Sequence, residues 1–278
     1  MDWNKTKTIF IIVFSILNVF LYSLYINRLT DAQNVQVMEK TPVVDLLKMD
    51  NISYSELPPY INDPSYLSAN DPSYLSAKFL PFTADEIADL ENQQAVIVDE
   101  THLKSKLSDP INVMTTKGDF DFTDFLAKYV LNGSDYMLWE VDEEQRSALY
   151  FQRAKNNPIY FSRNAMLRLF WNEDGEVDYY EQSMLGEFDT FNRKKDLISP
   201  IEAIGNLYSR GYLPQNSTLK QMTLGYSPLV QVTETQVFAP TWHVRVELKE
   251  GTIEDYFINA IEGKIIEFKL EVSDEENE

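Results

Sequence analysis

The sequence predicts an α+β protein with an N-terminal transmembrane helix, followed by two subdomains of antiparallel sheet with packed helices. Three observations support this fold class. Residues 9–26 form an uninterrupted apolar run. Short runs of alternating apolar and polar residues, separated by turn residues, fill the second half of the chain, as expected for antiparallel strands. Segments with helix-capping residues lie between these runs, which is the arrangement of an α+β fold.

The apolar run, IFIIVFSILNVFLYSLYI, has 18 residues and no charge. A spanning helix needs about 20 apolar residues, whereas the core of a cleaved signal peptide has about 7–15. No small-x-small cleavage site follows the run, so we expect an uncleaved, single-pass anchor at the cell membrane. Lys5 and Lys7 before the run, against Arg28 after it, favour a cytoplasmic N-terminus. The expected order is therefore a cytoplasmic segment 1–8, a span 9–26, a stalk 27–40 and an extracytoplasmic C-terminal region.

The extracytoplasmic part carries almost all of the acidic charge. The only charged residues among positions 1–26 are Asp2, Lys5 and Lys7, so the remainder of the chain has 22 basic and 43 acidic side chains. Such a surface repels nucleic acid and anionic lipid, and we expect neither as a ligand. The chain has no Cys, so its outer part must be stabilised by a hydrophobic core rather than by disulfides.

Helices are expected at residues 42–49, 83–90, 122–133 and 199–211. The last of these has four agreeing signals: Ser199 as N-cap, Pro200 at the first helical position, Glu202 completing a capping box, and Gly211 just after the end. Residues 166–185 read as two strands joined by a turn at Asp174. We place a first subdomain at 41–150, a second at 151–271 and a disordered acidic tail at 272–278.

The octapeptide NDPSYLSA occurs at residues 62–69 and again, unchanged, at 70–77. Functional repeat arrays normally use units of about 20 residues or more, repeated at least three times. We therefore interpret the second copy as a local duplication in an exposed loop, where insertions cost little entropy.

Catalytic, cofactor and metal motifs are not recognisable in the sequence, and we assign no residue to such roles. The chain has two histidines. His243 lies in an alternating run with Trp242 and Val244, which places it in the outward row of a strand, and His102 is expected in a turn or helix start. No G-x-S-x-G elbow or phosphate-binding loop accompanies them. The acids around Gly175 lack the spacing of a calcium loop and fit a hairpin tip.

Polar residues within the apolar run form one helical stripe. Ser15, Asn18, Tyr22 and Tyr25 follow the 3-4-3 spacing of a helix–helix contact. Asn18 lies near the middle of the expected span, where a side-chain amide facing lipid is costly and a partner helix can satisfy it. We predict that these four residues form a partner-binding seam; the alternative is that the tyrosines only mark the outer interface and Asn18 is tolerated.

Several segments resemble the YycI (WalI) family of Gram-positive bacteria, namely MDWNKTKTIFIIVFSILNVFLY, YLSAKF, SPIEAIGNLYSRGYL, LGYSPL and APTWHVRVELKEGTIEDYFINAIEGKII. The resemblance implies a YycH/YycI-like single-pass protein with an extracytoplasmic α+β region of two similar subdomains, whose C-terminal strands are PepSY-like. It implies as partners the YycH-like (WalH) protein and the YycG (WalK) sensor histidine kinase, whose two-component system controls cell-wall metabolism. It brings no catalytic residues. The duplicated octapeptide departs from the family pattern. The remaining alternative is a membrane-tethered wall enzyme or wall-ligand binding protein.

Overall fold

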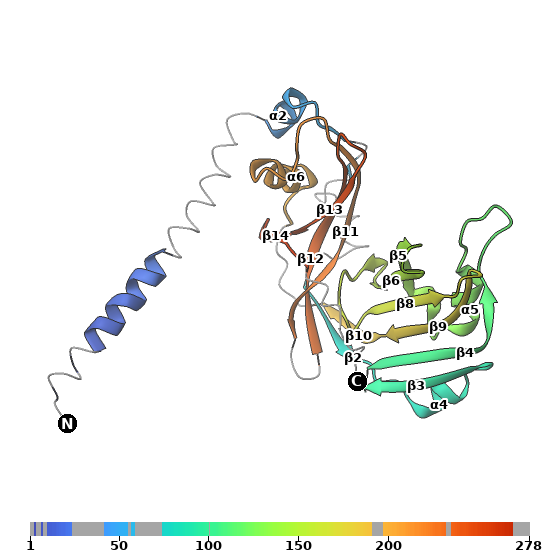
Figure 1. Ribbon diagram of the computed structural model, residues 1–278. Coiled ribbons are helices and arrows are strands. Elements are labelled where there is room, and N and C mark those ends of the chain that lie inside the picture. The colour runs from blue at the N-terminus through green and yellow to red at the C-terminus, as the bar shows by residue number, and fades with distance from the viewer. Residues whose placement is uncertain are drawn as a thin grey trace.

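The computed structural model describes residues 3, 7, 10–23, 42–54, 57–58, 74–99, 101–190, 197–231 and 235–268 of the 278-residue chain. Two sheets of seven strands each form two lobes, and short helices lie against both (Figure 1). All strand pairs but β1–β11 are antiparallel among the named strands of these ranges. The predicted α+β class with antiparallel sheets is therefore confirmed.

Sheet A is built around a long hairpin near the end of the chain. Its strands follow the order β1-β11-β12-β13-β14, and β2 pairs with both β12 and β10. The bounds are β1 (Ser53–Tyr54), β2 (Leu75–Phe79), β10 (Leu185–Thr190), β11 (Thr218–Gln231), β12 (Thr235–Glu247), β13 (Ile253–Asn259) and β14 (Ile265–Ile266).

Helices α2 (Val43–Met49) and α6 (Pro200–Ser209) cover one face of sheet A. Ser199 and Glu202 form the predicted capping box, in which each side chain bonds to the other residue's backbone amide. Leu47 and Ile204 are fully buried against Trp242 of β12. Capping thus sets where α6 begins, and apolar packing holds it against sheet A. The prediction of the α6 helix is confirmed.

Sheet B has the strand order β3-β4-β9-β8-β6-β5, with β7 paired to β6. The bounds are β3 (Gln93–Asp99), β4 (His102–Asn112), β5 (Tyr136–Asp142), β6 (Ser147–Ala154), β7 (Asn157–Pro158), β8 (Met166–Trp171) and β9 (Glu176–Ser183). Helices α4 (Ala84–Ala88) and α5 (Thr123–Tyr129) pack on one face around a core that includes Phe125, Leu167 and Tyr180. β8 and β9 form the hairpin predicted at Asp174.

The predicted helix 122–133 is shorter than expected. α5 ends at Tyr129, and Gly133 begins a 3₁₀ turn, η2 (Gly133–Asp135), instead of ending α5. A Cβ atom at Gly133 would overlap the Leu126 carbonyl oxygen. This glycine therefore allows a close backbone approach rather than a helix stop.

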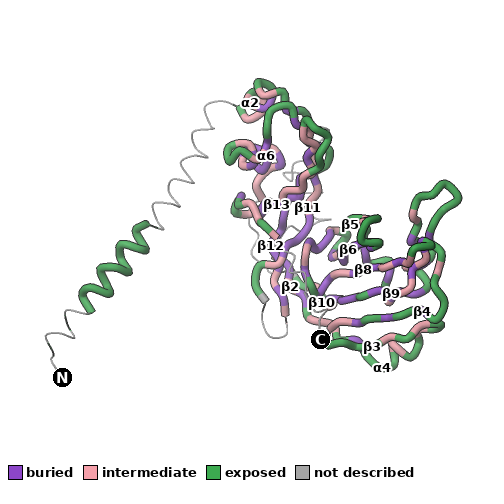
Figure 2. The backbone as a smooth tube through the Cα atoms, viewed as in Figure 1, coloured by how far each residue is buried: buried purple, intermediate pink, exposed green. Residues whose placement is uncertain are grey.

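The two lobes share buried contacts rather than a flexible linker. The Tyr160 amide donates to the Tyr226 carbonyl at 2.7 Å, and Ile159 bridges to the same strand, β11. Buried residues run along the sheet A strands and continue into the junction (Figure 2). Residue 150, our expected subdomain boundary, lies inside β6. Sheet B takes its strands from the single stretch 93–183, whereas sheet A combines β1 and β2, before that stretch, with β10 to β14, after it.

Residues 10–23 are helical, and the apolar side chains of residues 10–21 are 47–70 % exposed. Within the described ranges, no helix is both long and apolar enough to cross a membrane. Residues 9 and 24–26 of the expected span lie outside the described residues.

The loop interpretation of the second octapeptide is wrong for its last residues. Leu75, Ser76 and Ala77 lie in β2, between β12 and β10, and Leu75 and Ala77 are buried. Leu75 packs with Phe238 and Leu185. The alternation Leu-Ser-Ala is that of a half-buried strand. The repeated Asp-Pro pairs, which are typical of turns, favoured the loop interpretation instead.

Candidate functional site

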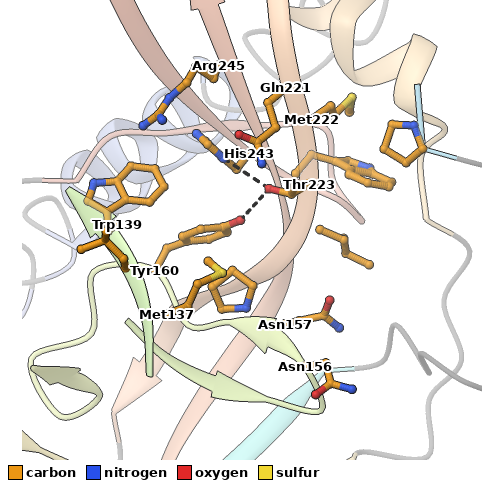
Figure 3. A pocket seen from close by; sticks show the side chains of 15 residues that line it. Met137, Trp139, Asn156, Asn157, Tyr160, Gln221, Met222, Thr223, His243 and Arg245 are labelled. Carbon is orange, nitrogen blue, oxygen red and sulfur yellow. Dashed lines mark hydrogen bonds between the residues drawn. The ribbon is translucent and has the colours of Figure 1, made fainter. Parts of the chain in front are cut away.

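A pocket of about 380 Å³ lies where the two lobes meet. Sheet A contributes side chains of β11 and β12, and sheet B contributes β5 and the turn at β7 (Figure 3). The walls combine aromatic and sulfur-containing side chains, such as Trp139 and Met222, with the amides of Asn156, Asn157 and Gln221.

Three residues that line this pocket, Tyr160, Thr223 and His243, belong to a chain of four polar groups that ends at Asp255. The Tyr160 hydroxyl lies 3.1 Å from Thr223 Oγ1, which lies 3.3 Å from His243 Nδ1. His243 Nε2 lies 2.6 Å from Asp255 Oδ1. An ionised carboxylate only accepts, so Nε2 carries the proton. In the neutral imidazole Nδ1 then accepts from Thr223, which leaves Thr223 to accept from Tyr160. Every bond in the chain has one donor and one acceptor.

Asp255 also holds the guanidinium of Arg245, with Nε donating to Oδ1 at 2.8 Å and Nη2 donating to Oδ2 at 3.0 Å. Partial burial opposes ionisation of Asp255, but the hydrogen bonds from His243 and Arg245 outweigh it and hold the pKa of the carboxyl below its usual range. The hydrogen bonds to Asp255 raise the pKa of Arg245. The Arg245 side chain lies 5.2 Å from the ring centroid of Trp139, within range of a cation–π contact.

The prediction that His243 faces outward is wrong, because its side chain is only 3 % exposed. The alternation itself holds, since Trp242 and Val244 face the α2 and α6 helices on the other side of sheet A. His243, however, lies against Trp139 and Tyr160 of the other lobe, at ring-centroid distances of 4.9 and 5.6 Å. Periodicity reports which residues share a face, but not whether a distant part of the chain covers that face.

His102 opens β4 rather than a turn or helix, so that expectation is also wrong. Its Nδ1 lies 2.6 Å from Asp99 Oδ1. The two histidines therefore belong to separate clusters, and each has its own carboxylate. Within the described residues, no group of three or more His, Asp or Glu side chains is placed to hold a metal ion.

The arrangement at His243 has the order carboxylate–imidazole–hydroxyl, which in enzymes activates a nucleophile. Here both ring nitrogens already have protein partners and the ring is enclosed by aromatic side chains. Thr223 is the member of the chain that is partly exposed and lines the pocket. Chemically, the arrangement holds the two lobes together and presents one hydroxyl to a pocket.

Ser15, Asn18 and Tyr22 of the predicted seam are exposed on the helix 10–23, and Tyr25 lies outside the described residues. The Asn18 side-chain amide donates to the Phe14 carbonyl oxygen at 2.9 Å. Asn18 thus has one partner within its own helix, which the spacing argument did not consider. The contact of these residues with another helix stays a prediction.

The functional residues that sequence reasoning missed are Tyr160, Thr223 and Asp255. Asp255 could have been found, because Arg245 and Asp255 are direct cross-strand partners in the predicted β12–β13 hairpin. Tyr160 could not, because it reaches Thr223 across the lobe junction from 63 residues away.

The fold and the junction define an α+β protein of two sheet lobes closed on each other by buried aromatic and polar contacts. A comparison with protein-family models matches residues 31–261 to the YycI protein family, and the chain belongs to the YycI family. This membership supports a regulatory role in the YycG system.

Two solved structures are similar in part. An uncharacterized protein from Eubacterium rectale aligns with a TM-score of 0.40 and 9 % identity, covering 71 % of this chain and 86 % of that one. YycH from Bacillus subtilis aligns with a TM-score of 0.36 and 11 % identity, covering 66 % of this chain and 52 % of that one. A search of curated proteins found no match.

Proposed function

We propose that this chain is a non-catalytic, membrane-anchored regulator that modulates the YycG-like (WalK) sensor histidine kinase, together with a YycH-like (WalH) partner. The kinase belongs to a two-component system that controls cell-wall metabolism. The observation that carries the proposal is the family match over residues 31–261, which includes both lobes.

Anchoring is supported by the exposed apolar surface of helix 10–23. A helix that is apolar on all sides is stable in lipid or within a larger apolar assembly, not in water. We propose that residues 9–26 span the membrane, with residues 1–8 in the cytoplasm, a stalk at 27–40 and both lobes outside. Protease added to intact protoplasts should then remove the lobes. Full protection of the lobes would contradict this orientation.

A non-catalytic role is supported by the enclosure of His243, whose ring nitrogens bond to Thr223 and Asp255. A second candidate, a wall enzyme or wall-ligand binding protein, is favoured by the 380 Å³ pocket beside Thr223. Thr223→Val separates catalysis from regulation, since it removes the hydroxyl while keeping the side-chain volume. A regulator should keep its effect on the kinase, whereas an enzyme using this hydroxyl would lose activity.

The direct experiment reconstitutes the kinase in lipid vesicles and measures its autophosphorylation with the full chain, with a chain lacking residues 9–26, and alone. We expect the full chain to change the rate and the truncated chain to do so less, because the helix raises the local concentration of the lobes. An unchanged rate, together with failure of the two proteins to co-purify from solubilised membranes, would refute the proposal.

A further inference from the structure

A second pocket, of about 410 Å³, lies on sheet B, and one of its lining residues, Met166, also packs against the aromatic cluster at the lobe junction. It is lined by β3 and β4, by β8 and β9, and by Arg163 from the segment before β8. Four of its side chains are basic: His102, Lys104, Arg163 and Arg168. The chain as a whole has 24 Lys and Arg against 44 Asp and Glu, so this concentration of basic groups runs against the composition.

The acidic side chains of the pocket are already paired. Glu181 accepts from Lys104 Nζ at 3.0 Å, and Asp99 bonds to His102. Among the residues that the structure describes, Arg163 and Arg168 form no ion pair. Two guanidinium groups therefore line the pocket without an ion pair to a carboxylate of the described residues.

The hydrogen bonds of His102 fix the position of its ring at the pocket. Nε2 lies 3.2 Å from the Arg163 carbonyl oxygen, which only accepts, so Nε2 carries a proton. Burial opposes ionisation of Asp99, but bonds from His102 and Thr101 hold the pKa of Asp99 below its usual range. Nδ1 lies 2.6 Å from Asp99 Oδ1 and 3.1 Å from Thr101 Oγ1. Both ring nitrogens of His102 therefore have protein partners.

The position of Arg163 is fixed by its backbone. Its carbonyl oxygen accepts from His102 of β4 and from the Ser183 hydroxyl of β9. These two strands anchor the residue at the edge of the pocket, where its exposed side chain is free to meet a ligand. Val98, 68 % exposed, and Met166 supply apolar surface beside the charges.

We propose that this pocket binds a ligand that carries a carboxylate or phosphate group beside a short apolar part. Guanidinium groups bind both anions through paired, charge-assisted hydrogen bonds. The two arginines would bind the oxyanion, and Val98 and Met166 would contact the apolar part. This site is independent of the kinase proposal, because the N-terminal helix does not contribute to it and its charged side chains lie on sheet B or in the segment before β8.

The test is titration calorimetry of the full chain in a nonionic detergent, with three probes that share a four-carbon chain: butanoate, butyl phosphate and butanol. We expect saturable binding of at least one anion and none of butanol. The anion that binds more tightly identifies the carboxylate or phosphate source of the natural ligand. Saturable binding of neither anion, or equal binding of butanol, would overturn the proposal.

Two variants test the residues. Arg163→Gln, at an exposed position, and Arg168→Gln should each weaken binding of the preferred anion by about tenfold or more. Arg210→Gln is the matched control, since Arg210 is an exposed arginine next to α6 in the other lobe and its substitution changes net charge equally. An equal loss in Arg210→Gln would show that binding depends only on overall charge and would refute the site.

Discussion

His243 Nε2 lies 2.6 Å from Asp255 Oδ1, on the neighbouring strand of sheet A, and the same carboxylate holds Arg245. His243 packs against the rings of Trp139 and Tyr160 from sheet B. The Asp255 carboxylate thus fixes the orientation of His243, the side chain through which sheet A contacts the other lobe. Its charge state should therefore determine how firmly the lobes are joined.

Asp255→Asn should lower the free energy of unfolding at pH 7 by about 1–3 kcal/mol. The amide still accepts from one donor, but Arg245 loses its ion pair. The loss of stability is modest because Arg245 is 32 % exposed and solvent screens its ion pair with Asp255. Urea unfolding followed by tryptophan fluorescence measures the change, and an unchanged midpoint would contradict it.

The same carboxyl should make the protein sensitive to acid. Its pKa is lower in the folded chain than in the unfolded chain, where an aspartate titrates near pH ~3.9. The stabilisation is therefore present above pH ~4 and is lost as the pH falls through the lower, folded value. The difference in stability between wild type and Asp255→Asn should shrink between pH 5 and pH 2, at about the pH values where aspartate titrates. A constant difference would show that the ion pair does not contribute.

Gly225→Ala should disrupt the junction by steric overlap. A Cβ atom there would overlap the Tyr160 ring and lie 2.6 Å from the Pro158 carbonyl oxygen. We expect a loss of about 1–3 kcal/mol, the usual range for overpacking. Gly186→Ala is the control, because its Cβ would meet only the flexible end of Leu80, at 3.3 Å. Equal melting temperatures for the two variants would refute the close approach at Gly225.

Local rules predicted much of this fold. The expected capping box at Ser199 forms, and the helix expected from Thr83 also begins with a capping box. Each box acts over only three residues. The hairpin at Asp174 depends on a turn and two flanking runs, and it also forms. His243 shows where such rules end, because its environment depends on Trp139, which lies more than one hundred residues earlier in the chain.

The duplicated octapeptide offers a test of strand choice. Leu75→Ala should lower the free energy of unfolding by about 2–4 kcal/mol, because Leu75 is fully buried against Phe238. The first copy could replace the second in β2 only by bringing Asn70 and Asp71 into the places of Lys78 and Phe79. That register would lose the ion pair between Lys78 and Glu187. Chemical unfolding of the variant measures the loss.

Leu67→Ala makes the same substitution in the first copy and is the matched control. We expect it to change stability by less than about 0.5 kcal/mol, because the buried position in β2 is taken by Leu75 of the second copy. Deleting either copy yields the same sequence, with one NDPSYLSA before Lys78, and should leave stability nearly unchanged. Equal losses for Leu67→Ala and Leu75→Ala would mean that both copies contribute to the fold.

The helix 10–23 carries the last prediction, which concerns Asn18. One proton of its side-chain amide is donated to Phe14. The second proton and the carbonyl oxygen remain for a partner helix on the side of Ser15 and Tyr22. Asn18→Leu removes these groups and makes membrane insertion easier. The protein should therefore accumulate normally in the membrane but bind its partner more weakly, by about 0.5–2 kcal/mol or about 2- to 30-fold. Leu21→Ala is the control, because Leu21 lies about 80° around the helix from the centre of the seam. Co-purification from solubilised membranes measures both variants.

Because the bond to Phe14 already satisfies one donor, a loss at Asn18 no larger than that at Leu21 would mean that this bond alone makes Asn18 tolerable in lipid. Recognition would then lie in the two lobes.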